Sequence, residues 1–189
     1  MLRHKGQAAI AAAVVMMCAV APASAREVVA FEGGVRPGTI VVKTAERRLY
    51  YVLGDGRALR YPVAVGRPGK QWQGAAQVSG KYVQPAWSPP DEVRADNPKL
   101  PSVIPGGSTH NPMGPRAMTL SGGQYAIHGT NKPSSIGTFA SYGCIRMLNQ
   151  DITDLFERVD VGTQVVVMRW RTERPGEADL LTLARGAIT

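Results

Sequence analysis

The first half of the chain carries short runs of β-branched, aromatic and other apolar residues, separated by residues that favour turns. Three such runs cover Thr39 to Thr44, Arg48 to Leu53 and Ala58 to Val65. Gly54-Asp55-Gly56 lies between the last two runs, and this composition is typical of a tight turn between antiparallel strands. The pattern therefore predicts an antiparallel meander, and Gln77 to Val83 is expected to form another strand.

The segment between residues 84 and 115 has a different composition. It contains eight prolines, the pair Gly106-Gly107 and only short apolar runs. A long irregular stretch inside a compact domain is often a binding loop or a lid. We therefore interpret this segment as a candidate loop of that kind.

A second hairpin is predicted after this segment. Ala117 to Leu120 and Gln124 to His128 flank Ser121-Gly122-Gly123, which has the composition of a hairpin turn. Residues 129 to 143 are rich in Ser, Thr and Gly and are expected to form a loop, with a helical turn near Pro133 to Ile136.

One amphipathic helix and a final strand are predicted near the C-terminus. Asn149 is a candidate N-cap for a helix of about ten residues. The apolar positions of this helix recur at helical spacing and are Ile152, Leu155, Phe156 and Val159. Thr163 to Trp170 reads as a buried strand that follows Gly162. The tail, residues 170 to 189, is expected to be either a short docking helix or a disordered end.

The first 25 residues read as a secretory signal peptide. Arg3, His4 and Lys5 precede an apolar run at residues 8 to 21, and the small residues Ala23-Ser24-Ala25 follow it. The alternative is a retained membrane anchor, but the run has 14 residues, whereas a transmembrane helix needs about 20. We therefore expect cleavage after Ala25 and no stable membrane insertion afterwards.

Composition limits the remaining possibilities. The 189 residues suit one domain, and 44% hydrophobic residues are enough to build a core. The formal net charge is +8, and loss of Arg3 and Lys5 with the leader would reduce it to +6. Such a charge suits an anionic envelope or polymer, although solubility alone explains it equally well. Nucleic acid is not an expected partner, because the chain would be exported and has no stripe of Lys or Arg.

The cysteines acquire a different meaning once the leader is removed. Cys18 lies in the leader, without the small residues that precede a lipid-modified cysteine, so Cys144 is the one thiol of the mature chain. It has no partner for an internal disulfide, and an unpaired thiol in an oxidising compartment is exposed to oxidation. Its environment decides between a buried inert thiol and a reactive one.

Residues around Cys144 supply the groups that cysteine catalysis requires. A thiol nucleophile needs a base and donors for the developing oxyanion. His128 ends a predicted strand sixteen positions earlier, and a flexible loop allows it to reach the sulfur. Gly143 permits close approach of the backbone to a substrate carbonyl. Arg146 would favour the thiolate or hold a substrate carboxylate.

These residues resemble the L,D-transpeptidase catalytic domain, also called the YkuD domain, of bacterial cell-wall enzymes. The matching motifs are His128-Gly129-Thr130 and Ser141-Tyr142-Gly143-Cys144-Ile145-Arg146, with Ile104-Pro105-Gly106-Gly107 and the segment 111 to 117 upstream. The resemblance covers about residues 38 to 169. Tyr142 is a departure, because histidine is usual at this position. At this position the resemblance therefore implies a role for the backbone N–H of Tyr142 more readily than for its side chain.

The resemblance, together with the strand count, implies a mostly β (α+β) domain. Its expected architecture is a curved mixed sheet or sandwich with one or two packed helices.

The resemblance also implies a reaction on peptidoglycan in the periplasm. Cys144 would attack the third residue of a stem tetrapeptide, release the terminal D-alanine and form a thioester. An amine acceptor, from another stem peptide or an envelope protein, would resolve it. His128 would serve as base and then acid, oriented by the Gly129 carbonyl or by Ser141.

Other site residues are assigned in the same way. The backbone N–H groups of Gly143 and Cys144, with that of Tyr142, would form the oxyanion hole. Arg146 would position the substrate. Candidates for the cleft wall are Asn111, Arg116 and Trp87.

Two alternative functions stay open at this stage. The same fold and cysteine could use water as acceptor, which would make the protein an amidase, carboxypeptidase or endopeptidase. A wall-binding module with an inert thiol is the other alternative. No cofactor or metal is expected, because His110 is isolated from other ligand-type residues and the chain has no phosphate-binding glycine motif.

Overall fold

A computed structural model describes residues 26–169 of the chain. Its elements in this range are mostly strands, and the strands come from all parts of the described sequence. The strands are β1 (Glu27–Ala30), β2 (Ile40–Lys43), β3 (Arg48–Gly54), β4 (Arg57–Gly66), β5 (Gly74–Val83), β6 (Arg116–Leu120), β7 (Ala126–His128), β8 (Phe139–Ser141), β9 (Ile145–Met147) and β10 (Gln164–Met168). The helices are α1 (Asp91–Asp96) and α2 (Asn149–Arg158), with a 3₁₀ turn at Pro133–Ser135.

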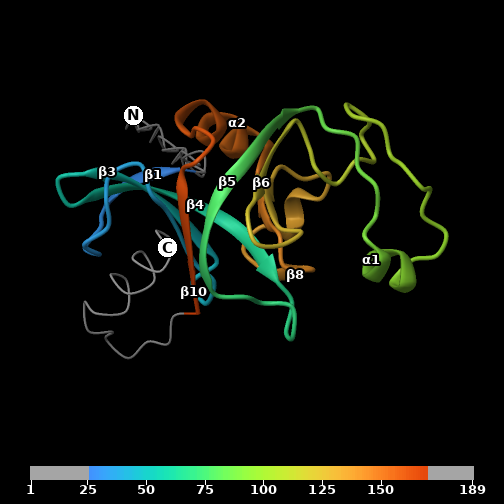
Figure 1. Cartoon of the computed structure of the whole chain (residues 1–189), viewed down its shortest axis with the longest axis horizontal. Helices are drawn as coiled ribbons and strands as arrows, with labels where there is room; N and C mark the ends of the chain where they lie inside the picture. Colours follow the sequence, from blue (N-terminus) through green and yellow to red (C-terminus); the bar gives the residue numbers. More distant parts are fainter. Residues whose placement is uncertain (1–25, 170–189) are drawn as a thin grey trace, which may run out of the picture.

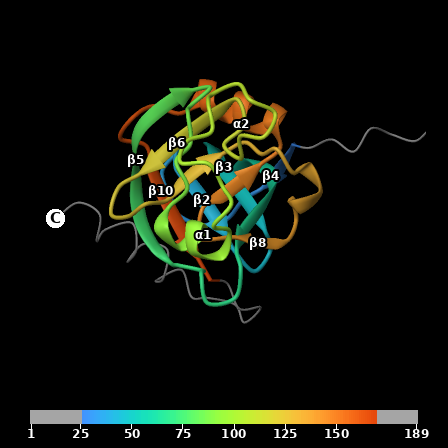
Figure 2. The same cartoon turned by 90° about the vertical axis from the view of Figure 1, so that its right-hand side faces the viewer.

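The strands form one mixed sheet in the order β1-β4-β3-β2-β10-β5-β6-β7-β9. A further antiparallel pairing of β9 with β4 closes the sheet on itself, and β8 joins the same strand in parallel. Figures 1 and 2 show the resulting curved wall of strands, with α2 packed against it and α1 standing apart. The expected curved mixed sheet with packed helices is confirmed.

The closed sheet is held by a core that its strands share with α2. Side chains of β2 alternate, so that Ile40 and Val42 join the inner core while Val41 joins a second cluster on the outer face. β10 behaves in the same way, with Val165 facing in and Val166 facing out. Because both faces of these strands are covered, their sequences read as unbroken apolar runs.

The local patterns of the sequence correspond to observed elements. β2, β3 and β4 form the predicted antiparallel meander. β6 and β7 form the second hairpin, and α2 carries its apolar face into the core through Ile152, Leu155 and Phe156. These predictions are confirmed because each one depends on neighbours close in the chain.

The predicted cap of α2 is wrong. Leu148 occupies the N-cap position without a side-chain bond, and Asn149 is the first helical residue. The side-chain oxygen of Asn149 instead accepts a hydrogen bond from the Thr130 N–H at 2.8 Å. Asn149 therefore joins the helix to the segment that follows His128, rather than capping the helix.

The proline-rich segment is more ordered than its composition indicated. It contains the helix α1 and a pair of backbone bonds between Trp87 and Ile104. Three strands were also not predicted, namely β1, β8 and β9. The expected signal peptide and C-terminal tail, and Trp170 at the end of the predicted last strand, lie outside the described residues. Within residues 26–169 there is no helix with the length and apolar character needed to cross a bilayer.

Asp151, in the first turn of α2, is a buried carboxyl group. The residue is 2% exposed, and within the described part of the chain its Oδ2 atom has no hydrogen-bond partner. Burial raises the pKa of Asp151 to about 6. Because the folded protein then binds more protons than the unfolded chain between about pH 4 and 6, this group lowers stability as the pH rises through that window.

We therefore expect Asp151→Asn to raise the free energy of unfolding at pH 7 by about 1–3 kcal/mol, with little gain at pH 4. Asp154 on the same helix is the matched control, since it accepts bonds from Tyr61 at 2.6 Å and from Arg158 at 2.9 Å. Asp154→Asn should be destabilising at pH 7. Urea unfolding at both pH values measures these effects, and equal losses in both variants would contradict this account of Asp151.

Candidate active site

The pairing of β7 with β9 brings the two predicted catalytic residues to one place. These strands run parallel, with Ile127 opposite Ile145 and His128 opposite Arg146. Side chains alternate along a strand, so Cys144, two residues before Arg146, is expected on the same face as His128. The sheet thus joins two motifs that are separated by a long loop.

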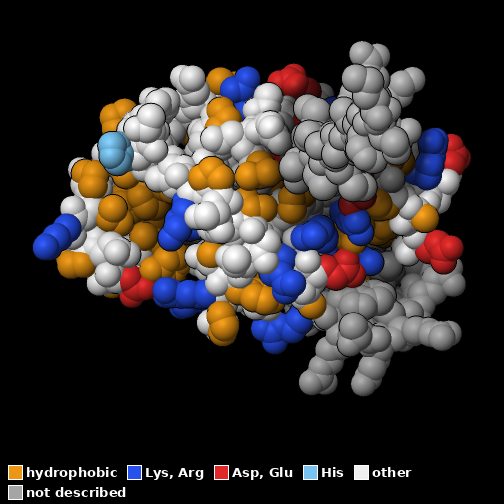
Figure 3. Space-filling model, turned by 180° about the vertical axis from the view of Figure 1, so that it is seen from behind, with side chains coloured by type: hydrophobic (Ala, Val, Ile, Leu, Met, Phe, Trp, Pro, Cys, Tyr) orange, Lys and Arg blue, Asp and Glu red, His pale blue; other side chains and the backbone are white. Residues whose placement is uncertain are grey.

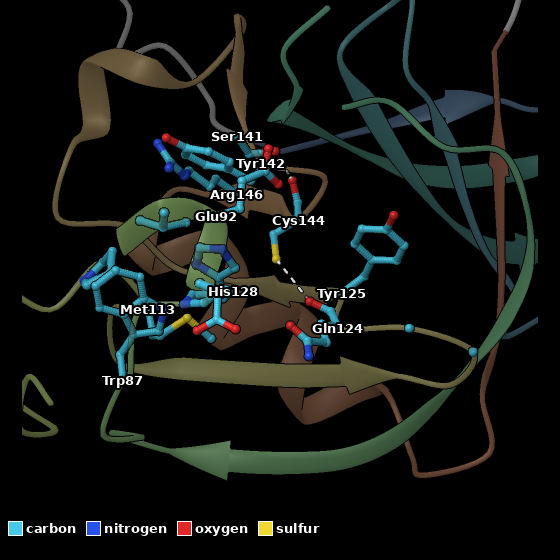
Figure 4. Close-up of a pocket in the computed structure, with 16 residues that line it drawn as sticks. Trp87, Glu92, Met113, Gln124, Tyr125, His128, Ser141, Tyr142, Cys144 and Arg146 are labelled. Atoms are coloured by element: carbon cyan, nitrogen blue, oxygen red, sulfur yellow. Dashed lines mark hydrogen bonds between the residues drawn. The ribbon is translucent and has the colours of Figure 1, made fainter. Parts of the chain in front are cut away.

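His128 and Cys144 line one cleft of about 370 Å³. Figure 4 shows the cysteine sulfur and the imidazole ring in this cleft, with Trp87 and Met113 near one end and Tyr125 near the other. Residues of α1 complete the lining. The cleft wall comprises Trp87, Pro90, Asp91, Glu92, Val93, Pro112, Met113, Gly122, Gly123, Gln124, Tyr125, His128, Ser141, Tyr142, Cys144 and Arg146.

The imidazole of His128 is held by the backbone next to it. Nδ1 lies 2.8 Å from the carbonyl oxygen of Gly129, so a proton on Nδ1 leaves Nε2 with a free lone pair. Burial lowers the pKa of His128 to about 4, helped by the positive charge of Arg146 and opposed by the carbonyls of Gly129 and Pro112. The ring is therefore neutral at physiological pH, which is the form that can accept a proton.

The thiol of Cys144 is also neutral at rest. Burial raises its pKa, while a backbone hydrogen bond from Ala126 and the charge of Arg146 act in the opposite direction. The sulfur lies 3.9 Å from the carbonyl oxygen of Gln124 (Figure 4). The site therefore contains a neutral thiol and a neutral base, so a thiolate would have to form by loss of the thiol proton.

The turn from Ser141 to Cys144 is fixed from within and from outside. Ser141 Oγ donates to the carbonyl of Cys144 at 2.6 Å and accepts the N–H of Gly143 at 3.1 Å. Trp72 donates to the Gly143 carbonyl at 3.0 Å and stacks on Tyr125. Gly143 has a φ of 119°, and a Cβ atom there would collide with the Tyr125 ring. Only glycine fits this position without strain.

Of the two residues predicted to orient His128, Gly129 and Ser141, only Gly129 contacts the imidazole ring through a hydrogen bond. The Gly129 carbonyl contacts the ring, whereas Ser141 uses its hydroxyl within the turn. Ser141 therefore supports Cys144 rather than the imidazole.

The turn also contains backbone N–H groups that have no hydrogen-bond acceptor in the described residues. Within residues 26–169, no acceptor bonds the N–H of Tyr142 or Cys144, so both could donate to an oxyanion. The Gly143 N–H is already bonded to Ser141, and its use would require that bond to break. The oxyanion hole stays a prediction, with Tyr142 and Cys144 as its available donors.

The structure divides the four candidate substrate residues into two pairs. Arg146 and Trp87 line the cleft. Asn111 is 2% exposed, and its amide donates to loop carbonyls, including that of Pro85 at 2.9 Å. Arg116 donates to the Pro115 carbonyl and lies over the Phe156 ring. Asn111 and Arg116 are therefore not part of the cleft wall, because each is used in packing elsewhere.

Several residues of the site carried no signal in the sequence. Trp72, Tyr125 and Gln124 reach Cys144 or its turn only through the closed sheet, and Asp96 reaches Tyr142 only because α1 lies at the side of the cleft. The one available hint was the proline-rich composition of the segment that carries α1. Its interpretation as a binding loop or lid agrees with the position of α1 at the cleft.

The chain matches the YkuD model, which describes the L,D-transpeptidase catalytic domain, over residues 37–167. The matched residues include most of the closed sheet and both His128 and Cys144. The fold and the site therefore correspond to a known class of domain. The chain belongs to the L,D-transpeptidase catalytic domain family.

Two Escherichia coli (strain K12) relatives carry the names of probable L,D-transpeptidases. YbiS is 42% identical over 135 residues, which cover 67% of this chain and 43% of that protein. ErfK/SrfK is 39% identical over 155 residues, which cover 75% of this chain and 48% of that protein. The chain thus spans less than half the length of these two relatives.

A solved structure supports the fold. The catalytic domain of the E. faecium L,D-transpeptidase acylated by ertapenem has a TM-score of 0.55 and 20% identity, and the match covers 72% of this chain and all of that domain.

Proposed function

We propose that the protein is an L,D-transpeptidase that transfers an acyl group from a peptidoglycan stem tetrapeptide to an amine, through a thioester on Cys144. The observation that carries this proposal is the neutral His128 ring in one cleft with the only free thiol of residues 26–169. The family membership of residues 37–167 supports the same substrate class.

In the first half-reaction, the thiol proton passes to Nε2 of His128 as the sulfur attacks the carbonyl carbon of the third stem residue. The carbonyl oxygen becomes negative, and the N–H groups of Tyr142 and Cys144 would stabilise it. Collapse of this intermediate breaks the peptide bond to the terminal D-alanine. The proton on His128 moves to the departing nitrogen, and the acyl group remains on sulfur.

In the second half-reaction, an amine attacks the thioester. His128 takes a proton from the amine nitrogen and returns it to the departing Cys144 sulfur, so that the enzyme recovers its neutral thiol and imidazole. The Gly129 carbonyl holds the ring in the same tautomer throughout. The acceptor is a stem-peptide amine or an amine of an envelope protein.

Arg146 is the residue best suited to bind a carboxylate of the donor. It lines the cleft, and within the described part of the chain its Nε atom is buried without a hydrogen-bond partner. A substrate carboxylate would satisfy this donor and the positive charge together. The Trp87 side chain would contact the apolar part of the same substrate.

The site of action proposed for the enzyme is the periplasm, reached through a signal peptide cleaved after Ala25. The remaining positive charge suits an anionic wall. On the face in Figure 3, Lys and Arg side chains are separated by hydrophobic and uncharged ones rather than joined in one stripe. This distribution fits weak attraction to a charged polymer.

Mass spectrometry of muropeptides tests the proposed function. We expect purified protein mixed with tetrapeptide-bearing wall fragments to yield cross-linked products with release of D-alanine. The Cys144→Ala protein should yield none. Tripeptide alone would indicate that water is the acceptor, and unchanged tetrapeptide would contradict the proposal.

A further inference from the structure

Tyr142 takes part in a polar cluster that the motif around Cys144 does not explain. Its hydroxyl donates to Asp96 Oδ2 at 2.5 Å, and Arg67 lies over its ring at 4.0 Å from the centroid. Arg67 Nη2 also donates to the same Asp96 oxygen at 2.9 Å. The three side chains therefore form a closed set of contacts between the catalytic turn, the end of β4 and α1.

Asp96 is the last residue of α1, and this helix has no apolar anchor. None of its six residues is buried. A second polar contact joins Glu92 of α1 to Lys70, in the same connection as Arg67. Figures 1 and 2 show α1 beside the sheet near β8 rather than packed among the strands. The position of α1 thus depends on polar contacts, in contrast to α2, which buries an apolar face.

The position of α1 also defines part of the cleft. Asp91, Glu92 and Val93 line the same space as Cys144 and His128. Figure 4 shows Glu92, on the ribbon of α1, among the residues drawn around this cleft, together with Tyr142 and His128. Movement of α1 would therefore change the shape of the cleft, without moving the strands that carry the thiol and the imidazole.

We propose that Tyr142 is a positioning residue, which holds α1 as one wall of the donor cleft through its bond to Asp96. The expected effect on the donor rests on the proposed function, whereas the contact between Tyr142 and Asp96 is independent of that function. Tyr142 thereby has a side-chain role in this chain, in place of the histidine usual at this position. Arg67 supports that role by contacting both the ring and the carboxylate.

Exposed polar contacts of this kind contribute little each, so α1 would be held by a small margin. Loss of the Tyr142 hydroxyl should therefore change the position of α1 while the core keeps its structure. Tyr142→Phe makes that change and preserves the ring beneath Arg67. Tyr50→Phe is the matched control, because the Tyr50 hydroxyl donates to the Glu46 carboxylate at 2.6 Å and neither residue lines the cleft.

Two measurements test the proposal on the full mature chain. The first is the rate of tryptic cleavage after Arg94, which lies within α1, followed by mass spectrometry. We expect Tyr142→Phe to be cleaved about fivefold faster than wild type, and Tyr50→Phe at the wild-type rate. The second is steady-state transfer from a tetrapeptide donor. We expect KM to rise about fivefold in Tyr142→Phe, with kcat within about twofold of wild type.

The outcomes separate this proposal from the proposed function. An unchanged cleavage rate in Tyr142→Phe would overturn the contact with α1, whatever the activity. Faster cleavage with unchanged KM and kcat would overturn the role in the donor cleft. Faster cleavage in a protein whose wild type shows no transfer would support the contact and contradict the proposed function instead. A fall in kcat alone would assign Tyr142 to the chemical step and overturn a positioning role.

Discussion

Replacement of Cys144 by alanine is expected to abolish acyl transfer, with a fall in kcat of about 10³-fold or more. The thiol is the only free cysteine of residues 26–169 and lies in the cleft with His128. Without the sulfur no thioester can form, and no other side chain in the proposed reaction replaces it. Release of D-alanine from a tetrapeptide donor measures the loss.

The fold should survive this substitution, because the Cys144 side chain is only half-buried and packs in no core cluster. Circular dichroism and thermal unfolding of the variant should match those of the wild type. Retained D-alanine release in a folded Cys144→Ala protein would exclude thiol catalysis. Wall binding that is equal in both proteins, with no turnover in either, would favour a binding module.

Replacement of His128 by glutamine is expected to lower kcat by about 10²- to 10⁴-fold. Glutamine can still donate a hydrogen bond to the Gly129 carbonyl, but it cannot accept the thiol proton. The variant therefore separates the base from its structural contact. Discontinuous assays of D-alanine release give kcat. Alkylation of Cys144 with iodoacetamide shows whether the thiol remains accessible.

The pH dependence of the wild type tests the same assignment. Because burial lowers the pKa of His128 to about 4, the ring loses its proton, and becomes a base, as the pH rises through about 4. We therefore expect kcat/KM to rise with pH to half its maximum at about pH 4, and to be level from about pH 5 through neutral pH. The low-pH limb should be absent from the residual activity of His128→Gln. An inflection near 6.5, the ordinary histidine value, would contradict a buried neutral base.

The sequence predicts the elements whose partners are close in the chain. The meander from Thr39 to Val65 and the hairpin at Ser121-Gly122-Gly123 are joined by turns, and α2 shows its apolar face at helical spacing. β8 and β9 have three residues each, and their pairing with β4 spans about 75 to 85 positions. Such pairings depend on tertiary closure, which a local pattern does not contain.

In the candidate site too, residues in local motifs could be predicted from the sequence, whereas contacts that depend on tertiary structure could not. His128, Gly129, Cys144 and Arg146 stand in compact motifs, and parallel pairing of two short strands explains how they meet. The contacts of Asn149 and Asp96 with the site were not predicted. Asn149 resembles a helix cap in sequence, and its bond to Thr130 exists only because the start of α2 lies beside the segment that follows β7. Local capping preference was outweighed by a tertiary hydrogen bond.

Intact-mass and peptide-mapping measurements on the acyl-enzyme test the central claim most directly. The mature protein would be mixed briefly with a tetrapeptide donor in the absence of an amine acceptor and quenched in acid. We predict a mass increase equal to the donor minus D-alanine, located on the peptide that contains Cys144 and absent from Cys144→Ala. Release of D-alanine without such an adduct, or an adduct on another residue, would contradict thioester catalysis by Cys144.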